Sequence, residues 1–344
     1  MNRSKKKDPV LLFYQAFESD TFFRNDRYLK RIIRPIYNRI NHTQKITGFD
    51  MWYRLLVKAL RTQGYRVLLN DYSWAKKHPS YPIGILGYPQ ILDDWELPNP
   101  AILGPGLYDH PMLAPDLFSD PRFKLYLLTC NWMHQMFTPH YGNRCVQWHA
   151  GIDLQNWPDT HNHPKSIDVL IYDKIRWNRD YYEPSLLHPI IDFLDSIKLS
   201  HVMIRYKYYD HKTYRALLSQ SKLMVFLCEH ETQGMAYQEA MASNVPILAW
   251  ENGWWLDPNR PKFQPEPVQA TSVPYFSAEC GERFQNINEF YTKFDYIWKN
   301  RGSYRPRAYV ERELSLAGSA EIYMTYYRQI AREQEIEQLG LIRE

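Results

Sequence analysis

Two glutamates, Glu231 and Glu239, are the side chains of this sequence whose type and spacing most clearly suggest chemistry. They lie in residues 223–253, which read LMVFLCEHETQGMAYQEAMASNVPILAWENG. An apolar run, a polar loop, a helix-forming stretch and a second apolar run predict a strand, a loop, a helix from about Gly234 and a strand from Pro246. Glu231 then lies in the loop and Glu239 about a turn and a half inside the helix. The two carboxylates can therefore contact different parts of one elongated ligand.

The predicted helix start lies between these two carboxylates. Its first turn has unpaired backbone N–H groups and the positive end of the helix dipole, which suit a diphosphate. A carboxylate accepts hydrogen bonds from sugar hydroxyls, and its two oxygens match a vicinal diol. The residues expected to line this place with Glu239 are Thr232, Gln233, Gly234 and Met235. On spacing alone, a pair of solvent-exposed glutamates is the alternative.

Short apolar runs alternate with helical periodicity along both halves of the chain, which predicts βαβ units on mostly parallel sheets. Strands are expected at 10–17, 66–72, 83–87, 101–103, 123–130, 144–148, 167–172, 202–206, 223–228 and 246–250. Helices are expected at 51–60, 186–197, 214–219, 287–298 and 319–337. Residues 156–164 have linker composition. We therefore expect domains at 1–158 and 159–305, and a helical segment at 306–344 that could pack back on the first domain.

Gly48 lies between the first expected strand and the first expected helix. A glycine there lets the backbone turn tightly and approach a ligand, although turn geometry alone explains it equally well.

The segment EAMASNVPILA, residues 239–249, resembles the EAMA-x-G-x-P segment of retaining glycosyltransferases with the GT-B fold, above all family 4. The E-x7-E motif of that family matches Glu231 and Glu239. The resemblance implies an α/β fold of two Rossmann-like domains facing an interdomain cleft. It implies that Glu231 contacts donor-sugar hydroxyls, that Glu239 contacts the ribose, and that Gly234 opens a helix facing the phosphates. The chain departs from the family at Thr232, Gln233 and Asn244.

The family also has a basic pair after the first strand of its C-terminal domain. In DVLIYDKIRWNRD, residues 168–180, the best matches are Lys174 and Arg179, with Arg176 as a further candidate. Positive charge there stabilises a leaving nucleoside diphosphate, and strand carboxyl ends face the ligand crevice in such sheets. A solvated loop with scattered charge is the alternative.

Three further segments resemble the family. His149–Asp153, followed by Trp157, resembles the segment that closes the N-terminal domain, which implies a structural role. Residues 271–276 resemble a bacterial branch associated with surface-polysaccharide synthesis. His110 in GLYDHP matches a family histidine that contacts the transferred sugar, with ordinary packing as the alternative.

The resemblance implies a front-face substitution, which needs no protein base. His161 and His163 have no third ligand in reach by spacing, so we expect no essential metal. We expect no cofactor apart from the nucleotide-sugar substrate.

Composition limits the remaining functions. A chain of 344 residues predicts two domains, and a net charge of +4 is too small to indicate nucleic-acid binding. The four cysteines are widely spaced, which favours a reducing cytoplasm. No apolar run approaches the roughly 18 residues that a membrane span needs. The basic, amphipathic segment Arg24–Arg39 either contacts an anionic membrane surface or packs on the first domain.

We therefore expect a retaining hexosyltransferase that takes a UDP- or GDP-linked sugar to a glycan or lipid-linked oligosaccharide. Two alternatives stay open. One is a nucleotide-sugar 2-epimerase of the same double-Rossmann form, and the other is a non-catalytic sugar-binding subunit.

Overall fold

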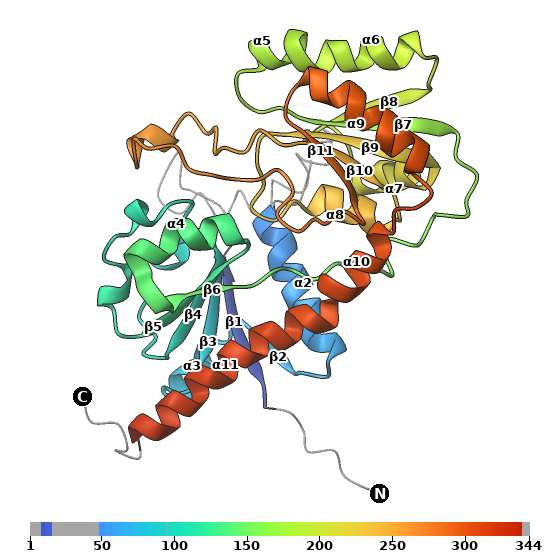
Figure 1. Ribbon diagram of the computed structural model, residues 1–344. Helices are drawn as coiled ribbons and strands as arrows, with labels where there is room; N and C mark the ends of the chain where they lie inside the picture. The colour runs from blue at the N-terminus through green and yellow to red at the C-terminus, as the bar shows by residue number, and fades with distance from the viewer. Residues whose placement is uncertain (1–7, 16–47, 94, 339–344) are drawn as a thin grey trace, which may run out of the picture. The chain divides into compact units, whose positions relative to one another are not determined.

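Two α/β units make up the computed structural model of this chain (Figure 1). The structure describes residues 8–15, 48–93 and 95–338. Described residues up to Gly151, together with those from Leu314, form the first unit, and Ile152–Glu313 forms the second. The basic segment Arg24–Arg39 lies outside the described residues.

The first unit is built on a parallel sheet whose strands follow the order β2-β1-β3-β4-β5-β6. Its strands are β1 (Val10–Gln15), β2 (Val67–Leu69), β3 (Ile83–Gly87), β4 (Ala101–Gly106), β5 (Phe123–Leu128) and β6 (Cys145–Gln147). Its helices are α2 (Gly48–Thr62), α3 (Tyr72–Lys77), α4 (Asn131–Tyr141) and α11 (Leu316–Gln338). The central strands are apolar and buried along nearly their whole length, as expected for a sheet covered on both faces.

Helix α11 is fixed to the first unit by contacts with residues far away in the sequence. It packs against α2, and the Ser319 hydroxyl donates to the carbonyl of His149 at 2.7 Å. A Cβ at Gly151 would lie 2.6 Å from the Cα of Leu316, so only glycine permits this approach. The His149–Asp153 segment therefore has a packing function at this point.

The second unit has a parallel sheet in the order β11-β10-β9-β7-β8. Its strands are β7 (Ile167–Lys174), β8 (His201–Arg205), β9 (Ser221–Cys228), β10 (Ile247–Trp250) and β11 (Gly281–Phe284). Its helices are α5 (Arg179–Tyr182), α6 (His188–Ser196), α7 (His211–Gln220), α8 (Met235–Ala242), α9 (Ile287–Asn300) and α10 (Pro306–Glu313), with a π-helical turn at Glu183–Leu187.

The chain order of this second sheet reverses between two adjacent strands. From β7 the chain goes to β8 on one side and then returns to β9 on the other. In open parallel sheets, ligands bind at the carboxyl ends of the strands where the order reverses, because the connecting loops part there. The strand ends Lys174 and Cys228 are register partners at this switch point.

The predicted α/β fold class, with two Rossmann-like parallel sheets, is confirmed. The expected strands all appear, and the expected helix near Gly234 begins at Met235. Helix α4 and strand β11 have no counterpart among the expected elements. Strand β11 is short and has the charged residues Glu282 and Arg283 at its centre, so no apolar run marks it.

Candidate functional site

The switch point of the second sheet brings Lys174 and Glu231 into contact. Lys174 ends β7, and Glu231 lies in the β9–α8 loop, Glu229–Gly234. The Lys174 ammonium donates a hydrogen bond to Glu231 Oε1, and only 11% and 9% of the two side chains are exposed. Burial is the largest influence and acts to lower the pKa of Lys174, but Glu231 together with the other neighbouring groups raises the pKa overall. The pair is therefore a buried ion pair in which the lysine keeps its charge.

Neighbouring groups fix this ion pair in place. The Lys174 ammonium lies 4.5 Å from the centroid of the Tyr206 ring, a cation–π distance. The Glu231 amide donates to the Thr271 carbonyl at 2.9 Å. Burial is the main cause of a raised pKa of the Cys228 thiol, and the charge of Glu231 raises it further, so the thiol stays protonated. The Cys228 thiol donates a hydrogen bond to Glu231 Oε1 at 3.6 Å.

Gly234 gives the β9–α8 loop its shape. It caps α8 in the left-handed region at φ +83°, and an added Cβ would lie 2.1 Å from the Tyr237 ring. No other residue type fits there without rearrangement. No side chain caps the helix, so the first-turn amides from Met235 onward have no intrahelical acceptor. An anion at this position would supply one.

The loop residues before Gly234 differ in exposure. Gln233 is buried, and its side-chain amide Nε2 donates to Gln238 Oε1 at 3.1 Å. Gln238 Nε2 donates in return to the backbone carbonyl of Gln233 at 2.8 Å. Gln233 thus holds the loop on the helix. Thr232 and Met235 are half-buried.

Glu239 is a buried carboxylate on α8. Only 4% of the residue is exposed, and burial raises the pKa of its carboxyl well above the ordinary value although Arg215 acts in the opposite direction. Among the described residues, its carboxylate has no hydrogen-bond partner. Its carboxylate oxygens are not among the fully enclosed polar atoms that have no partner, so they face space that a ligand can reach. Glu239 therefore indicates a place for a ligand that donates hydrogen bonds.

The two predicted arginines have different surroundings. The Arg179 guanidinium donates to both carboxylate oxygens of Asp173, at 3.1 and 2.7 Å, and to Glu183 at 2.9 Å. Arg176 lies in the β7–α5 loop, Ile175–Asn178, and its Nη2 donates to the carbonyl of His230 at 2.9 Å. Arg176 is thus the arginine bonded to the loop that carries Glu231.

Glu229 is a residue of this site that sequence analysis missed. Its side chain is fully buried, and its Oε1 accepts hydrogen bonds from the backbone amides of Arg176 at 2.7 Å and Trp177 at 2.9 Å. The available signal was an acidic residue directly after the apolar run Leu223–Cys228.

His110 and Gly48, two further predicted site residues, both belong to the first unit. His110 follows β4, is fully buried, and its Nδ1 accepts a hydrogen bond from the Met112 amide at 3.1 Å. Gly48 begins α2, and an added Cβ there would meet no atom within 4 Å. Packing does not require glycine at that position. The ligand contacts expected of these two residues stay predictions.

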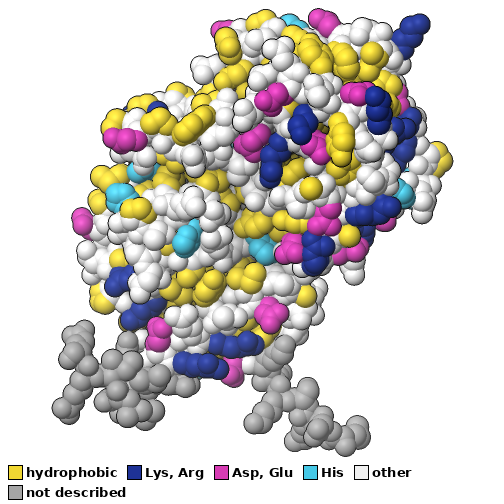
Figure 2. Space-filling model, viewed as in Figure 1, with side chains coloured by type: hydrophobic (Ala, Val, Ile, Leu, Met, Phe, Trp, Pro, Cys, Tyr) yellow, Lys and Arg dark blue, Asp and Glu magenta, His cyan; other side chains and the backbone are white. Residues whose placement is uncertain are grey.

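Other chemical features are distributed over the surface. His161 and His163 are both exposed, and the described part of the chain has no cluster of three or more residues able to hold a metal ion. None of the helices in the described ranges is long and apolar enough to cross a membrane. On the face shown in Figure 2, basic and acidic side chains are interspersed over the second unit. Within the second unit, Lys293 forms an ion pair with Glu282 and Arg312 with Glu279.

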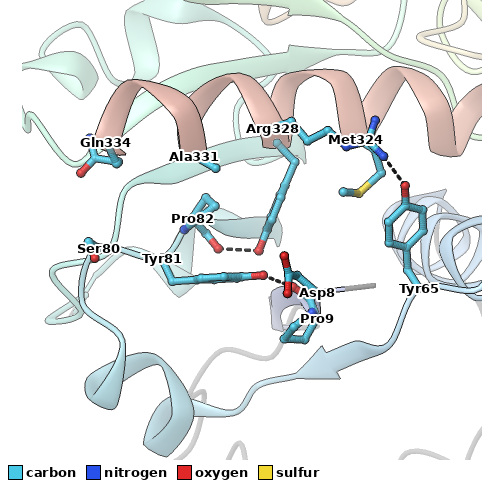
Figure 3. Close-up of a pocket in the computed structure, with 11 residues that line it drawn as sticks. Asp8, Pro9, Tyr65, Ser80, Tyr81, Pro82, Met324, Arg328, Ala331 and Gln334 are labelled. Carbon is cyan, nitrogen blue, oxygen red and sulfur yellow. Dashed lines mark hydrogen bonds between the residues drawn. The ribbon is translucent and has the colours of Figure 1, made fainter. Parts of the chain in front are cut away.

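A cavity of about 520 Å³ lies in the first unit, beside α11 and the amino ends of β1 and β3 (Figure 3). Its tyrosine hydroxyls are already bonded. Tyr81 donates to the carbonyl of Pro9, and Tyr65 accepts from Arg328. Burial, with the charge of Asp8, raises the pKa of Tyr81 to about 12, so its hydroxyl remains a donor. We call Tyr65, Tyr81 and Tyr327 the tyrosine seam, which attaches α11 to the strands.

Comparison with known proteins identifies the fold. No family model matches the chain, and no curated protein matches it in sequence. Its structure is similar to a glycosyltransferase from Rickettsia africae ESF-5, with 12% identity, a TM-score of 0.54, and 95% of this chain and 99% of that chain covered. It is similar to sucrose-phosphate synthase from Thermosynechococcus elongatus, with 11% identity, a TM-score of 0.56, and 94% and 99% covered.

A third similar structure is the catalytic domain of starch synthase IV from Arabidopsis thaliana bound to ADP and acarbose. It has 9% identity and a TM-score of 0.52, with 84% of this chain and 79% of that chain covered. These likenesses, with the two parallel sheets, define the fold as the GT-B type with two Rossmann-like domains. At such identities they establish the fold alone, and activity has to be argued from the site.

Proposed function

We propose that this protein is a glycosyltransferase that binds a nucleotide-sugar donor at the switch point of its second sheet. The observation that carries the proposal is the arrangement around α8. Its uncapped amino end lies between a buried Lys174–Glu231 ion pair and the buried carboxylate of Glu239. Glu231, then Lys174 with the first-turn amides, then Glu239 offer partners for a sugar, a diphosphate and a ribose in turn.

Each group then binds one part of the donor. Glu239 accepts hydrogen bonds from the ribose hydroxyls, which removes the cost of its unbonded burial. The first-turn amides of α8 and the Lys174 ammonium hold the diphosphate. Glu231 accepts from hydroxyls of the donor sugar, while its ion pair keeps it oriented. Lys174 also stabilises the negative charge that develops on the diphosphate as it leaves.

The reaction transfers the anomeric carbon from one oxygen to another. The bond between that carbon and the diphosphate oxygen breaks, and a bond to the acceptor hydroxyl oxygen forms on the same side of the sugar, which retains the configuration. The acceptor proton goes to the departing diphosphate. No protein base is required by this route.

The proposal includes a hexose donor on UDP or GDP and a glycan or lipid-linked oligosaccharide acceptor, in synthesis of a surface polysaccharide. The E-x7-E resemblance supports the donor class. The structurally similar starch synthase IV domain, bound to ADP and acarbose, supports a nucleotide and a glycan as ligands of this fold.

A thermal-shift panel of nucleotide sugars and free nucleotides tests the proposal, because a ligand that binds only the folded state raises the melting temperature. We expect one nucleotide and its sugar conjugate to stabilise the wild type. The additional stabilisation by the sugar conjugate over the free nucleotide should be reduced in Glu231→Gln and kept in Glu321→Gln, a control on the exposed side of α11. A panel without any stabilising member would contradict the proposal. A C2-epimeric product formed without acceptor would instead indicate an epimerase.

A further inference from the structure

The β7–α5 loop places two arginines in unequal positions. Arg179 has four N–H donors engaged, with Asp173, Glu183 and the carbonyl of Ile175 as acceptors. The Arg179 guanidinium therefore links the start of α5 to the end of β7. Arg176 uses Nη2 on the His230 carbonyl and has Nε 3.6 Å from Glu229 Oε2. Within the described residues, Arg176 Nη1 donates to no acceptor, and 30% of this side chain is exposed.

Electrostatics separate the two arginines in the same way. Burial acts to lower the pKa of Arg176, but neighbouring groups, among them the carboxylates of Glu231 and Glu229, raise it overall. The pKa of Arg179 is raised first by its hydrogen bond to Asp173, and Glu183 is the other charged partner. Arg176 is therefore within the field of Glu231, whereas Arg179 is neutralised by its own acidic neighbours.

Glu229 holds Arg176 in this position. Its Oε1 fixes two successive amides of the loop, at Arg176 and Trp177, and its Oε2 faces the Arg176 guanidinium. The guanidinium also lies 4.0 Å from the centroid of the Trp177 ring. Because the Glu229 carboxylate is fully buried, water cannot replace these contacts. The β7–α5 and β9–α8 loops are thus joined in both directions, by Glu229 to the backbone and by Arg176 to His230.

We infer that Arg176, and not Arg179, is the second cation that contacts the donor diphosphate, and that Glu229 is the positioning residue that presents it. This inference rests on the proposed function. Under this inference, Glu229 affects the affinity for the diphosphate through Arg176, in addition to stabilising the folded loop.

The test compares two probes for each variant by isothermal titration calorimetry. The probes are whichever of UDP, GDP and ADP stabilises the wild type most, and the monophosphate of the same nucleoside. The Kd of the monophosphate divided by the Kd of the diphosphate measures how much the second phosphate contributes to binding. We expect Arg176→Gln to reduce this ratio about tenfold, the value of one charge-assisted contact. Arg179→Gln should lower the melting temperature and keep the ratio.

Glu229→Gln keeps an acceptor for the two amides but loses the charge that faces Arg176, so the protein should fold with a reduced ratio. Glu229→Asp keeps the charge with a shorter reach and should restore part of the ratio. A ratio that falls in Arg179→Gln but not in Arg176→Gln would overturn the assignment. A lower melting temperature with an unchanged ratio in Glu229→Gln would reduce Glu229 to a structural role. If the wild type binds none of the diphosphates, the proposed function itself fails.

Discussion

Two regions of this molecule bring together polar side chains from distant parts of the sequence, and the bonding of these side chains differs between the regions. In the tyrosine seam, the groups are neutral and bonded to backbone or to a neighbour. The Tyr327 hydroxyl accepts from the Leu11 amide at 3.1 Å and donates to the Pro82 carbonyl. At the switch point, the groups are charged, and Glu239 has no hydrogen bond within the described residues.

This difference distinguishes a region that attaches α11 to the first sheet from a region that binds a ligand. A fully bonded neutral group lowers the free energy of the folded state and leaves little for a ligand to gain. A buried carboxylate without a partner costs free energy until a ligand supplies one. The seam should therefore govern stability and the switch point should govern ligand affinity, which the following variants test in order of expected effect.

The largest effect is expected at the ion pair. Glu231→Gln removes the charge that faces Lys174 and one acceptor for the donor sugar. We expect turnover to fall by about 10²–10³, as when one preorganised electrostatic contact to a transition state is lost. Single-turnover transfer with the donor found in the panel measures this. A rate within threefold of the wild type would show that Glu231 does not contact the reacting sugar.

The second effect concerns stability. Tyr327→Phe leaves the buried Leu11 amide and Pro82 carbonyl without their partner, at a cost of about 1–3 kcal/mol for each group. Urea unfolding should therefore show a loss of a few kcal/mol, while nucleotide affinity stays unchanged. Tyr296→Phe, at an exposed tyrosine of α9, is the matched control. Lost nucleotide affinity in Tyr327→Phe would break the distinction between the two regions.

The smallest expected effect is a gain in stability, at Glu239. Because the folded state raises the pKa of Glu239, the carboxyl favours folding only while it is protonated. Its contribution is complete below its ordinary pKa of about 4.3 and is lost as the pH rises through the folded-state value. Glu239→Gln should thus melt higher than the wild type at neutral pH, with a difference that shrinks towards pH 4. The variant should also lose the stabilisation by nucleotide.

Thermal melts from pH 4 to pH 8, with and without nucleotide, check this prediction. A variant that melts lower than the wild type at neutral pH would indicate that the Glu239 carboxylate is already satisfied in the empty protein.

The sequence predicted local features better than contacts between loops. Apolar runs marked β7 and β9, and the E-x7-E spacing placed Glu231 and Glu239 on a loop and a helix, as the structure has them. It favoured Arg179 over Arg176, because the difference in their surroundings depends on Asp173, whose carboxylate accepts hydrogen bonds from residues two and six positions later in the chain. Glu229 was missed for a similar reason. Its partners are backbone amides more than fifty residues away, and no periodicity reports such a pairing.

Hydrogen–deuterium exchange with and without the stabilising nucleoside diphosphate tests the central claim most directly. We expect slower exchange in peptides that cover residues 173–178 and 229–240, where the loop amides and the first turn of α8 meet the ligand, and no change in peptides that cover the tyrosine seam. Protection at the seam, or a stabilising nucleotide that leaves 229–240 unprotected, would contradict a donor site at the switch point.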